Sequence, residues 1–303
     1  MIDRIVKKLN YSGNFFRFSS PDTRNFYSAM RHLVNFNTVK NRKYIGENIV
    51  EKIKPLDISK ETSYLFLDPY SLPHSKEMVN HANDIFNEQT EESLSNVINS
   101  KVHLPIVKAG EVLKSNNPFI KFALDPLILS TVSNYLGMFP VLSNIHLWYS
   151  PNDKVNKGTS QEFHLDHADV SQVKIFIAVD DIDEDSGPLL IIDSSSSEKL
   201  TRNIDYKLSN SKKRVDDKVI EEILGDSIIK PVIGPRGSIS LIDSCKCLHA
   251  GSRKSKKPRK IIMIQYLSPF AFQYPLLGLS KVVPFKDLKI RNRIAKFALG
   301  QLN

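Results

Sequence analysis

The spacing of hydrophobic and polar positions changes near residue 140. Before that point the best helical segment is Pro126–Leu136, whose apolar residues gather, imperfectly, on one face. Asp125 is a suitable N-cap, a proline fits the first helical position, and Gly137 suits a left-handed C-cap. Residues 75–99 also favour a helix, with interruptions. We therefore predict that residues 1–140 form a mostly helical surround on the outside of a β-rich core.

From Val141 onward the apolar positions alternate with a period of two, which is typical of strands. The segment VLSNIHLWYS (141–150) is a clear example, with Asn144, His146 and Trp148 on its more polar face. A further strand is predicted to carry His164 and Asp166. Others are predicted over residues 173–179, 189–192, 238–243, 247–249 and 260–267. Short strands separated by Gly and Pro turns indicate an all-β sandwich or barrel.

Two histidines and an aspartate in this β-rich part, followed by an arginine, suggest a metal centre. His164 and Asp166 stand two positions apart, with His249 and Arg259 far downstream. Residues i and i+2 of a strand project to one side, so the first two side chains can reach the same ion. Two imidazoles and one carboxylate can cap one face of an octahedral Fe(II) and leave three positions open. His249 is the best candidate for the third ligand.

Two other arrangements compete for the same residues. His167 and Asp169 form a second His-x-Asp pair, three residues further along the chain. Cys245, Cys247 and His249 alternate along one predicted strand and raise the possibility of a zinc site. Neighbours on one strand face rarely give tetrahedral geometry, and no fourth ligand is evident, so zinc is disfavoured.

Two longer stretches resemble the phytanoyl-CoA dioxygenase family of 2-oxoglutarate oxygenases. They are FHLDHADVSQVKIFIAVDDIDEDSGPLLII and GPRGSISLIDSCKCLHAGSRKSKKPRKIIMIQYLSPFAF, and the resemblance covers roughly residues 125–270. The spacing from His164 to Lys174 and to the turn Ser186–Pro188 fits the family pattern, which favours His164 over His167. One departure is Ser194–Ser197, which stands where a Gly-Ser-His tripeptide is common in the family.

The resemblance implies a fold and an activity. The fold would be mainly β, a double-stranded β-helix (a cupin-like jelly roll). The chain would be one catalytic domain, with a jelly-roll core over residues 141–270 and a lid-like insert over 196–230. Within that insert, Asp216–Leu224 reads as a helix ended by Gly225. The activity would be that of a 2-oxoglutarate-dependent dioxygenase, using Fe(II), 2-oxoglutarate and O2 to hydroxylate an aliphatic C–H bond.

The resemblance also assigns roles to two basic residues. His164, Asp166 and His249 would hold the iron, and Arg259 would clamp the distal carboxylate of 2-oxoglutarate through two parallel hydrogen bonds. Arg259 lies in a basic run, where a solvated surface arginine is the ordinary outcome. Its position immediately before the apolar strand IIMIQYL separates it from its neighbours. Lys174 would be a second, weaker cosubstrate contact, for which a solvated lysine is the simple alternative.

Composition indicates a soluble protein with an uneven positive charge. The 303 residues are 41% hydrophobic and 25% charged, which is typical of a globular chain. We find no run of about 18 uncharged apolar residues. The first residues lack the apolar core of a signal peptide, and Cys245 and Cys247 are poorly spaced for a disulfide. These features lead us to expect a cytoplasmic protein in a reducing compartment.

The net charge of +9 bears on partners. Residues 281–303 hold six Lys/Arg against one acidic residue. We expect a small, anionic substrate and no nucleic acid. Apolar residues at helical spacing predict a basic helix over Phe285–Leu302, which we expect to dock on the protein itself rather than on an anionic membrane. The alternatives are a non-catalytic jelly-roll binding protein and a hydroxylase of a membrane-associated glycolipid sugar.

Overall fold

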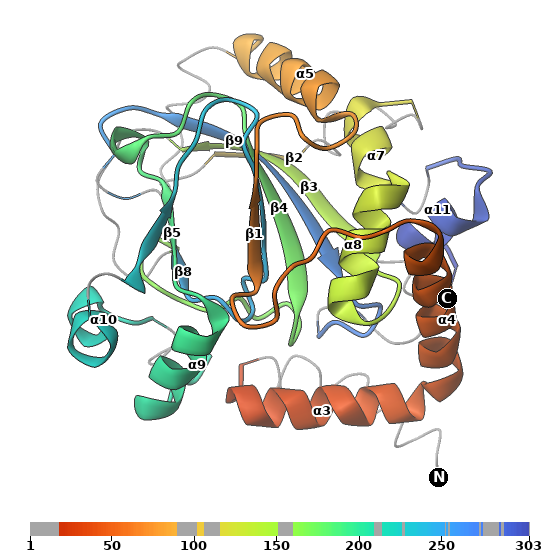
Figure 1. Cartoon of the computed structure of the whole chain (residues 1–303), viewed down its shortest axis with the longest axis horizontal. Coiled ribbons are helices and arrows are strands. Elements are labelled where there is room, and N and C mark those ends of the chain that lie inside the picture. The colour runs from red at the N-terminus through yellow and green to blue at the C-terminus, as the bar shows by residue number, and fades with distance from the viewer. Residues whose placement is uncertain are drawn as a thin grey trace.

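Two antiparallel sheets form the centre of the computed structural model, which describes residues 18–89, 102–105, 116–150, 160–208, 214–225, 228–251, 253, 255–272, 274, 285 and 288–302. The larger sheet has the order β1 (Tyr64–Leu67), β7 (Ile239–Ile242), β4 (Gln172–Ala178), β9 (Arg259–Leu267), β3 (Val141–Ser150) and β2 (Val102–Pro105). The smaller sheet has the order β6 (Lys230–Val232), β5 (Leu189–Ile191) and β8 (His249–Ala250). Figure 1 shows the smaller sheet opposite the larger one.

Alternation along the strands gives the larger sheet two different faces. Its outer face, which includes Ile175 and Ile264, packs against α5 (Ser75–Asn87), α7 (Pro118–Ala123) and α8 (Pro126–Leu136) in one apolar core. Figure 1 shows α7 and α8 beside this face. On the inner face, Phe176 and Met263 contact Ile191 of the smaller sheet. The space between the sheets is therefore apolar at this level and is closed by side chains from both.

Local sequence signals placed two helices well. Helix α8 begins and ends as predicted: the Asp125 side chain accepts a hydrogen bond from Leu127 N, and Gly137 ends the helix at φ 70°. Helix α10 (Asp217–Leu224) ends at Gly225 as predicted, and Asp216, predicted as its first residue, is its N-cap. Both predictions depended on caps that lie within one turn of the helix they end.

The prediction of a mainly β protein was wrong, because helices hold more of the described residues than strands do. Besides α5, α7 and α8, the α-helices of the described residues are α3 (Pro21–Val34), α4 (Phe36–Lys52), α9 (Ser194–Asn203), α10 and α11 (Arg293–Ala298). Helix α9 was missed because its first turn is a run of serines, which favour turns; the Asp193 side chain caps it by accepting from Ser196 N.

The segment 1–140 is not only a helical surround, because it contributes two strands. Strands β1 and β2 form the two edges of the larger sheet. Each has four residues, too few to show alternation, and each is fixed by pairing with a distant strand, such as Tyr64 with Ile242. Helix α5 ends at Asn87, and the remainder of the predicted 75–99 helix lies outside the described residues from 90 onward.

The insert between residues 196 and 230 packs against the segments that carry the candidate ligands. Leu200 of α9 and Ile220 of α10 belong to one buried apolar cluster with Phe163 and Leu248. The insert thus helps to fix the neighbours of His164 and His249.

The predicted helix over the basic tail is much shorter than expected. Helix α11 covers six residues, and residues 288–292 before it are not helical. The Asn292 side chain caps its start by accepting from Ala295 N. At its other end, buried Arg42 of α4 donates to Phe297 O at 2.9 Å, and also to Leu302 O at 2.6 Å. Residues 281–284 and 286–287 lie outside the described part.

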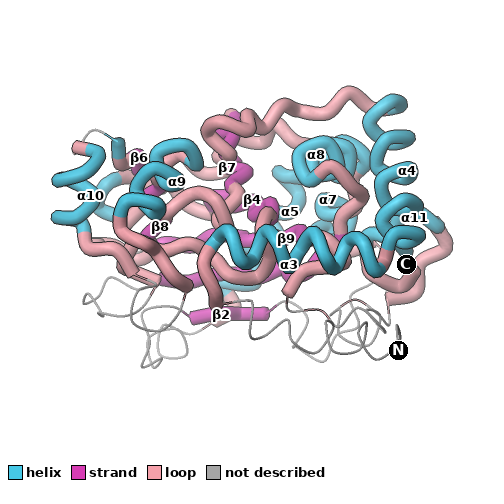
Figure 2. The backbone as a smooth tube through the Cα atoms, turned by 90° about the horizontal axis from the view of Figure 1, so that it is seen from below, coloured by secondary structure: helices cyan, strands magenta, loops and turns pink. Residues whose placement is uncertain are grey.

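Arginines of α3 and α4 tie distant segments to these helices. Arg31 donates to Ala271 O at 3.0 Å and to Tyr274 O at 2.8 Å, and Arg24 donates to Asp169 O. Arg31 and Arg42 are fully buried, and within the described residues both guanidinium groups donate to backbone carbonyls. Figure 2 shows α3 lying across the molecule between α9 on one side and α4 with α11 on the other. No described helix is long and apolar enough to cross a membrane.

Deleting residues 286–303 is expected to lower the thermal unfolding temperature by roughly 6 °C or more. Phe297 and Leu299 are buried in the main core, which corresponds to about 3 kcal/mol or more for two large apolar side chains. At this chain length, 1 kcal/mol shifts Tm by about 2–4 °C. Lys289→Ala, at an exposed position of the same tail, is the control and should leave Tm unchanged. An unchanged Tm on truncation, with loss of salt-sensitive binding to anionic vesicles, would instead assign the tail to a membrane.

Candidate metal centre

His164 and His249 face each other across a two-residue antiparallel bridge. His164 N donates to His249 O at 3.0 Å, and His249 N donates to His164 O at 3.1 Å. Residues that exchange both backbone hydrogen bonds are directly opposite, so their side chains project to the same side. The two imidazole centroids are 4.3 Å apart. The bridge therefore holds the two rings together through the backbone alone.

Backbone carbonyls also orient the rings. The Nδ1 atom of His164 lies 2.8 Å from Glu162 O, and the Nδ1 atom of His249 lies 3.0 Å from Cys247 O. A carbonyl can only accept, so each Nδ1 carries a proton, and Nε2 is the ring nitrogen left to bind a metal. A partner of this kind on the second ring nitrogen is usual for metal-bound histidines.

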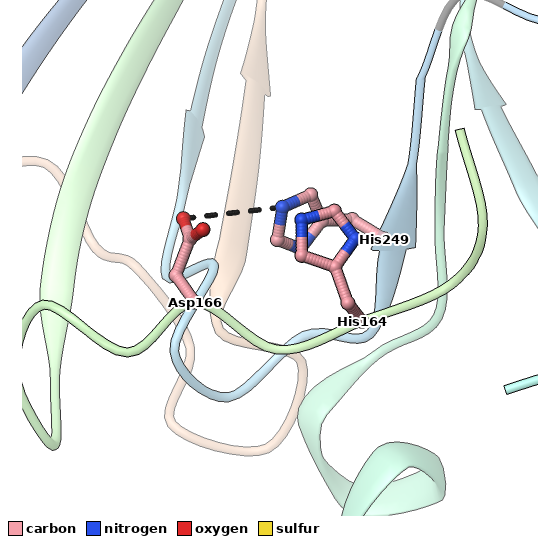
Figure 3. Close-up of side chains that lie close together, drawn as sticks. All are labelled: His164, Asp166 and His249. Atoms are coloured by element: carbon pink, nitrogen blue, oxygen red, sulfur yellow. Dashed lines mark ion pairs between the residues drawn. The ribbon is translucent and has the colours of Figure 1, made fainter. Parts of the chain in front are cut away.

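Asp166 completes the group, although it does not lie on a strand. The segment 165–167 is irregular, and Asp166 N donates to Ser244 O at 2.8 Å. The prediction that His164 and Asp166 reach one ion because they stand two positions apart on one strand was therefore wrong in its reason. Asp166 nevertheless points toward the two histidines (Figure 3), and its Oδ2 lies 3.9 Å from His249 Nε2.

The structure brings the three predicted ligands together. One potential ligand atom from each of His164, Asp166 and His249 lies within 4.8 Å of the other two. Within the described parts of the chain, this is the only group of three or more His, Cys, Asp or Glu side chains arranged to hold a metal ion.

The competing residues have other surroundings. Asp169 is buried and accepts from Ser268 Oγ at 2.6 Å, so it ties two loops together. The His167 ring lies 4.9 Å from the Phe18 ring. Cys245 and Cys247 lie in a turn rather than on a strand, and Cys247 Sγ contacts Thr62 O at 3.3 Å. The structure gives no support to a zinc site with these cysteines.

Burial and neighbouring charges favour the metal-binding protonation states. Burial, followed by the charge of His249, holds the pKa of His164 well below its usual value, so this ring is neutral. Burial alone would raise the pKa of Asp166. Lys174, followed by His249, outweighs it and holds the pKa of Asp166 well below its usual range. A neutral imidazole and an ionised carboxylate are the forms that bind a divalent cation.

Lys174 contacts a ligand of the candidate metal centre. Its Nζ lies 2.5 Å from Asp166 Oδ2, and its side chain is 11% exposed. The solvated-lysine alternative is therefore wrong. The contact also gives Lys174 a partner that the sequence did not indicate, because the two residues are eight positions apart and belong to different elements.

Arg259 differs from the other described members of its basic run. Arg253 pairs with Asp217 at 2.8 Å, Lys256 with Asp185 at 2.8 Å, Lys257 with Asp183 at 2.5 Å and Lys260 with Asp180 at 3.3 Å. Arg259 is 3% exposed, and its Nε has no hydrogen-bond partner among the described residues. Burial lowers the pKa of Arg259 to about 10, so the guanidinium remains charged at neutral pH. Arg259 is therefore not a solvated surface arginine.

The turn at Ser186–Pro188 holds the basic run in place. Lys256 N donates to Asp185 O at 2.7 Å. Gly187 has φ 60°, and a Cβ there would lie 2.8 Å from the Cβ of Ser255. Glycine is required for this close approach of the acidic turn to the strand that begins at Arg259.

Arg259 lies on the wall of a cavity of about 300 Å³ at one end of the space between the sheets. Trp148, Phe176, Leu189 and Ile261 contribute to the wall. The three candidate ligands do not line it. They lie close to the cavity through strand pairing: Leu189, on the cavity wall, is two residues from Ile191, and Ile191 pairs with His249.

A second cleft, of about 590 Å³, lies beside the ligand-bearing loop. Its lining includes Leu165, between two of the ligands, and Tyr206, whose hydroxyl accepts from Leu165 N at 3.1 Å. Acidic and basic side chains contribute equally to it: Asp22, Glu61, Glu198 and Asp205, with Arg24, Lys60, Arg202 and Lys246.

Sequence reasoning missed two polar residues of the site. Gln172 Nε2 donates to Asp166 Oδ2 at 2.9 Å, and Ser244 Oγ donates to the same oxygen at 2.6 Å. Gln172 stands two positions before Lys174 on a strand that is otherwise apolar, so the polar pair was visible in the sequence. Nothing in the sequence signalled Ser244.

No family model matches the chain, and no curated protein matches its sequence. Several solved structures are similar to it. EctD from S. alaskensis in its apoform is 13% identical, with a TM-score of 0.47 over 76% of this chain and 79% of that one. HygX from Streptomyces hygroscopicus with nickel and 2-oxoglutarate bound is 15% identical, with a TM-score of 0.42 over 69% and 83%. The epimerase SnoN, in complex with Fe3+, alpha ketoglutarate and nogalamycin RO, is 12% identical, with a TM-score of 0.46 over 75% and 84%. At this level of similarity, the activity has to be inferred from the side chains of the chain itself.

Proposed function

We propose that this protein is an Fe(II)- and 2-oxoglutarate-dependent dioxygenase that hydroxylates an aliphatic C–H bond of a small molecule. The observation that carries the proposal is the buried group of His164, Asp166 and His249. One potential ligand atom from each of the three side chains lies within 4.8 Å of the other two. Two imidazoles and one carboxylate form the ligand set of non-haem Fe(II) oxygenases, which leaves three metal positions open.

Arg259 supports the 2-oxoglutarate part of the proposal. A buried guanidinium with no described acidic partner is costly, and a carboxylate that enters the cavity would offset that cost. The planar guanidinium can donate two parallel hydrogen bonds to a carboxylate. The apolar walls of the cavity, among them Phe176 and Leu189, suit the methylene groups of a dicarboxylic acid. In this proposal Arg259 holds the distal carboxylate, and Lys174 remains with Asp166.

When bound, iron and 2-oxoglutarate together supply the oxidation of an unreactive C–H bond by O2, with release of succinate and CO2. The residues of the chain supply position and the exclusion of water. The His164–His249 bridge fixes the two imidazoles, and Phe176, Ile191 and Met263 exclude water where they pack together between the sheets. We also infer that the two facing sheets form a double-stranded β-helix of the jelly-roll type.

The substrate is proposed to be small and polar. The cleft next to Leu165 is rich in polar side chains, which supports a hydrogen-bonding substrate. Its balanced acidic and basic residues do not favour one sign of charge, so they add nothing to the anionic substrate suggested by the net charge. A non-catalytic binding protein would not need two histidines and an aspartate gathered in a metal-binding arrangement, which favours the enzyme.

Anaerobic titration tests the proposal. Adding 2-oxoglutarate to the protein with one equivalent of Fe(II) should produce a weak visible charge-transfer band, because the keto acid would chelate the iron. Exposure to O2 should then release succinate, slowly alone and faster with the substrate in a metabolite screen. Fe(II) binding with no band and no succinate would contradict the proposed use of 2-oxoglutarate.

A further inference from the structure

We propose that Lys174, Gln172 and Ser244 are positioning residues that hold Oδ2 of Asp166 and leave Oδ1 as the only oxygen offered to the metal. This inference rests on the proposed function, because it concerns the carboxylate of the same centre. It gives Lys174 a role different from the cosubstrate contact implied by the family resemblance.

Three donors converge on one carboxylate oxygen. Lys174 Nζ lies 2.5 Å from Asp166 Oδ2, Ser244 Oγ lies 2.6 Å from it, and Gln172 Nε2 lies 2.9 Å from it. A carboxylate oxygen has two lone pairs, so three donors saturate Oδ2. Over the described residues, no hydrogen bond reaches Oδ1. The two oxygens of Asp166 are therefore not equivalent.

A row of side-chain amides fixes the orientation of Gln172, one of the three donors to Asp166. Asn144 Nδ2 donates to Gln265 Oε1 at 2.9 Å, and Gln265 Nε2 donates to Gln172 Oε1 at 2.6 Å. Gln172 is fully buried, and its Nε2 reaches both Asp166 Oδ2 and Ser244 Oγ. The row crosses strands β3, β9 and β4 on the inner face of the larger sheet. Because each amide oxygen accepts from the preceding residue, the Gln172 amide has its N–H groups directed at Asp166.

A single available oxygen matters for the number of open metal positions. An octahedral ion with two imidazoles and one carboxylate oxygen keeps three positions. A carboxylate that binds with both oxygens would occupy one of them. By holding Oδ2, the three donors would preserve the positions needed by a chelating keto acid and by O2.

Co(II) is a suitable probe, because its binding and its visible d–d spectrum can be followed without turnover. We would titrate Co(II) into the metal-free wild type and into Lys174→Met, Gln172→Leu and Ser244→Ala, with folding checked by circular dichroism. Lys230→Met is the matched control, since Lys230 also donates one hydrogen bond from a strand, to the Tyr64 hydroxyl at 2.7 Å, and contacts none of the three donors.

Loss of any one donor should weaken Co(II) binding about 10- to 100-fold, the usual effect of residues that orient a metal ligand. The d–d bands should change shape as Asp166 becomes free to bind with both oxygens, and Lys230→Met should match the wild type. Wild-type affinity and spectrum in Lys174→Met, Gln172→Leu and Ser244→Ala would overturn the positioning role and leave the metal centre intact. A wild type that binds no Co(II) would overturn both.

Discussion

Replacing His164 with alanine is expected to abolish Fe(II) binding, with a loss of affinity of more than about 100-fold. The change removes one of three ligands, whereas residues that only orient a ligand already cost about 10- to 100-fold. The fold should survive, because His164 is held to His249 through backbone atoms that alanine retains. Equilibrium dialysis with Fe(II) under anaerobic conditions measures the affinity, and circular dichroism confirms that the variant is folded.

His167→Ala is the matched control, because it removes the first histidine of the neighbouring His-x-Asp pair. Its ring lies against Phe18 and outside the three-residue group, so iron binding should be retained. The reverse result, with iron lost in His167→Ala and kept in His164→Ala, would mean that the second pair holds the metal. Asp169 is a poor control, since it is buried and accepts hydrogen bonds from Ser268.

Replacing Arg259 with methionine should have opposite effects on ligand affinity and on the stability of the ligand-free protein. Affinity for 2-oxoglutarate should fall by about 1.5–3 kcal/mol, the contribution of a hydrogen bond to a charged group. Without 2-oxoglutarate the variant should unfold at a higher temperature than the wild type. Its buried charge, which has no described acidic partner, is replaced by an apolar side chain of similar length.

Thermal unfolding with and without 2-oxoglutarate measures both effects. Ligand at 100 times its Kd stabilises a protein by about 2.7 kcal/mol, and this increase should be largely lost in Arg259→Met. Arg253→Met is the control: Arg253 belongs to the same basic run, but it pairs with Asp217, so its loss should leave the response to 2-oxoglutarate unchanged. If 2-oxoglutarate stabilises Arg259→Met as much as the wild type, another cationic side chain binds its distal carboxylate.

The sequence predicted those features whose causes lie within a few residues. Helix α8 is an example, because Asp125, Gly137 and the apolar positions between them are all local. The long inner strands were also predictable, since β3 alternates over part of its ten residues and β9 carries the apolar run IIMIQYL within its nine. The three candidate ligands and Arg259 were identified because their order along the chain follows a pattern.

The features that were missed are set by contacts between distant segments. Strand β1 exists because Tyr64–Leu67 pairs with Ile239–Ile242, and no local sequence pattern predicts this pairing. The tail helix was overestimated: it begins only after the Asn292 cap, and residues 288–292 before that cap are not helical. At its other end Arg42, 255 residues away along the chain, donates to Phe297 O, a contact that no local pattern indicates. The surroundings of Asp166 could not be predicted for the same reason: Ser244 is 78 residues away, and the direction of the Lys174 side chain depends on the loop that carries Asp166.

The arginine clamps of α3 and α4 also bear on the order of events during synthesis. Arg31 and Arg42 lie near the start of the chain, but their acceptors Tyr274 and Leu302 are made 243 and 260 residues later. At a translation rate of about 5–20 residues per second, each guanidinium waits on the order of 10–50 s for its carbonyls. Until then, the faces of α3 and α4 that carry these arginines have no native partner in the last segments. The first two helices of the described part of the chain are therefore among the last to reach their final contacts, and a nascent chain that stalls before residue 270 should expose them to chaperones or proteases.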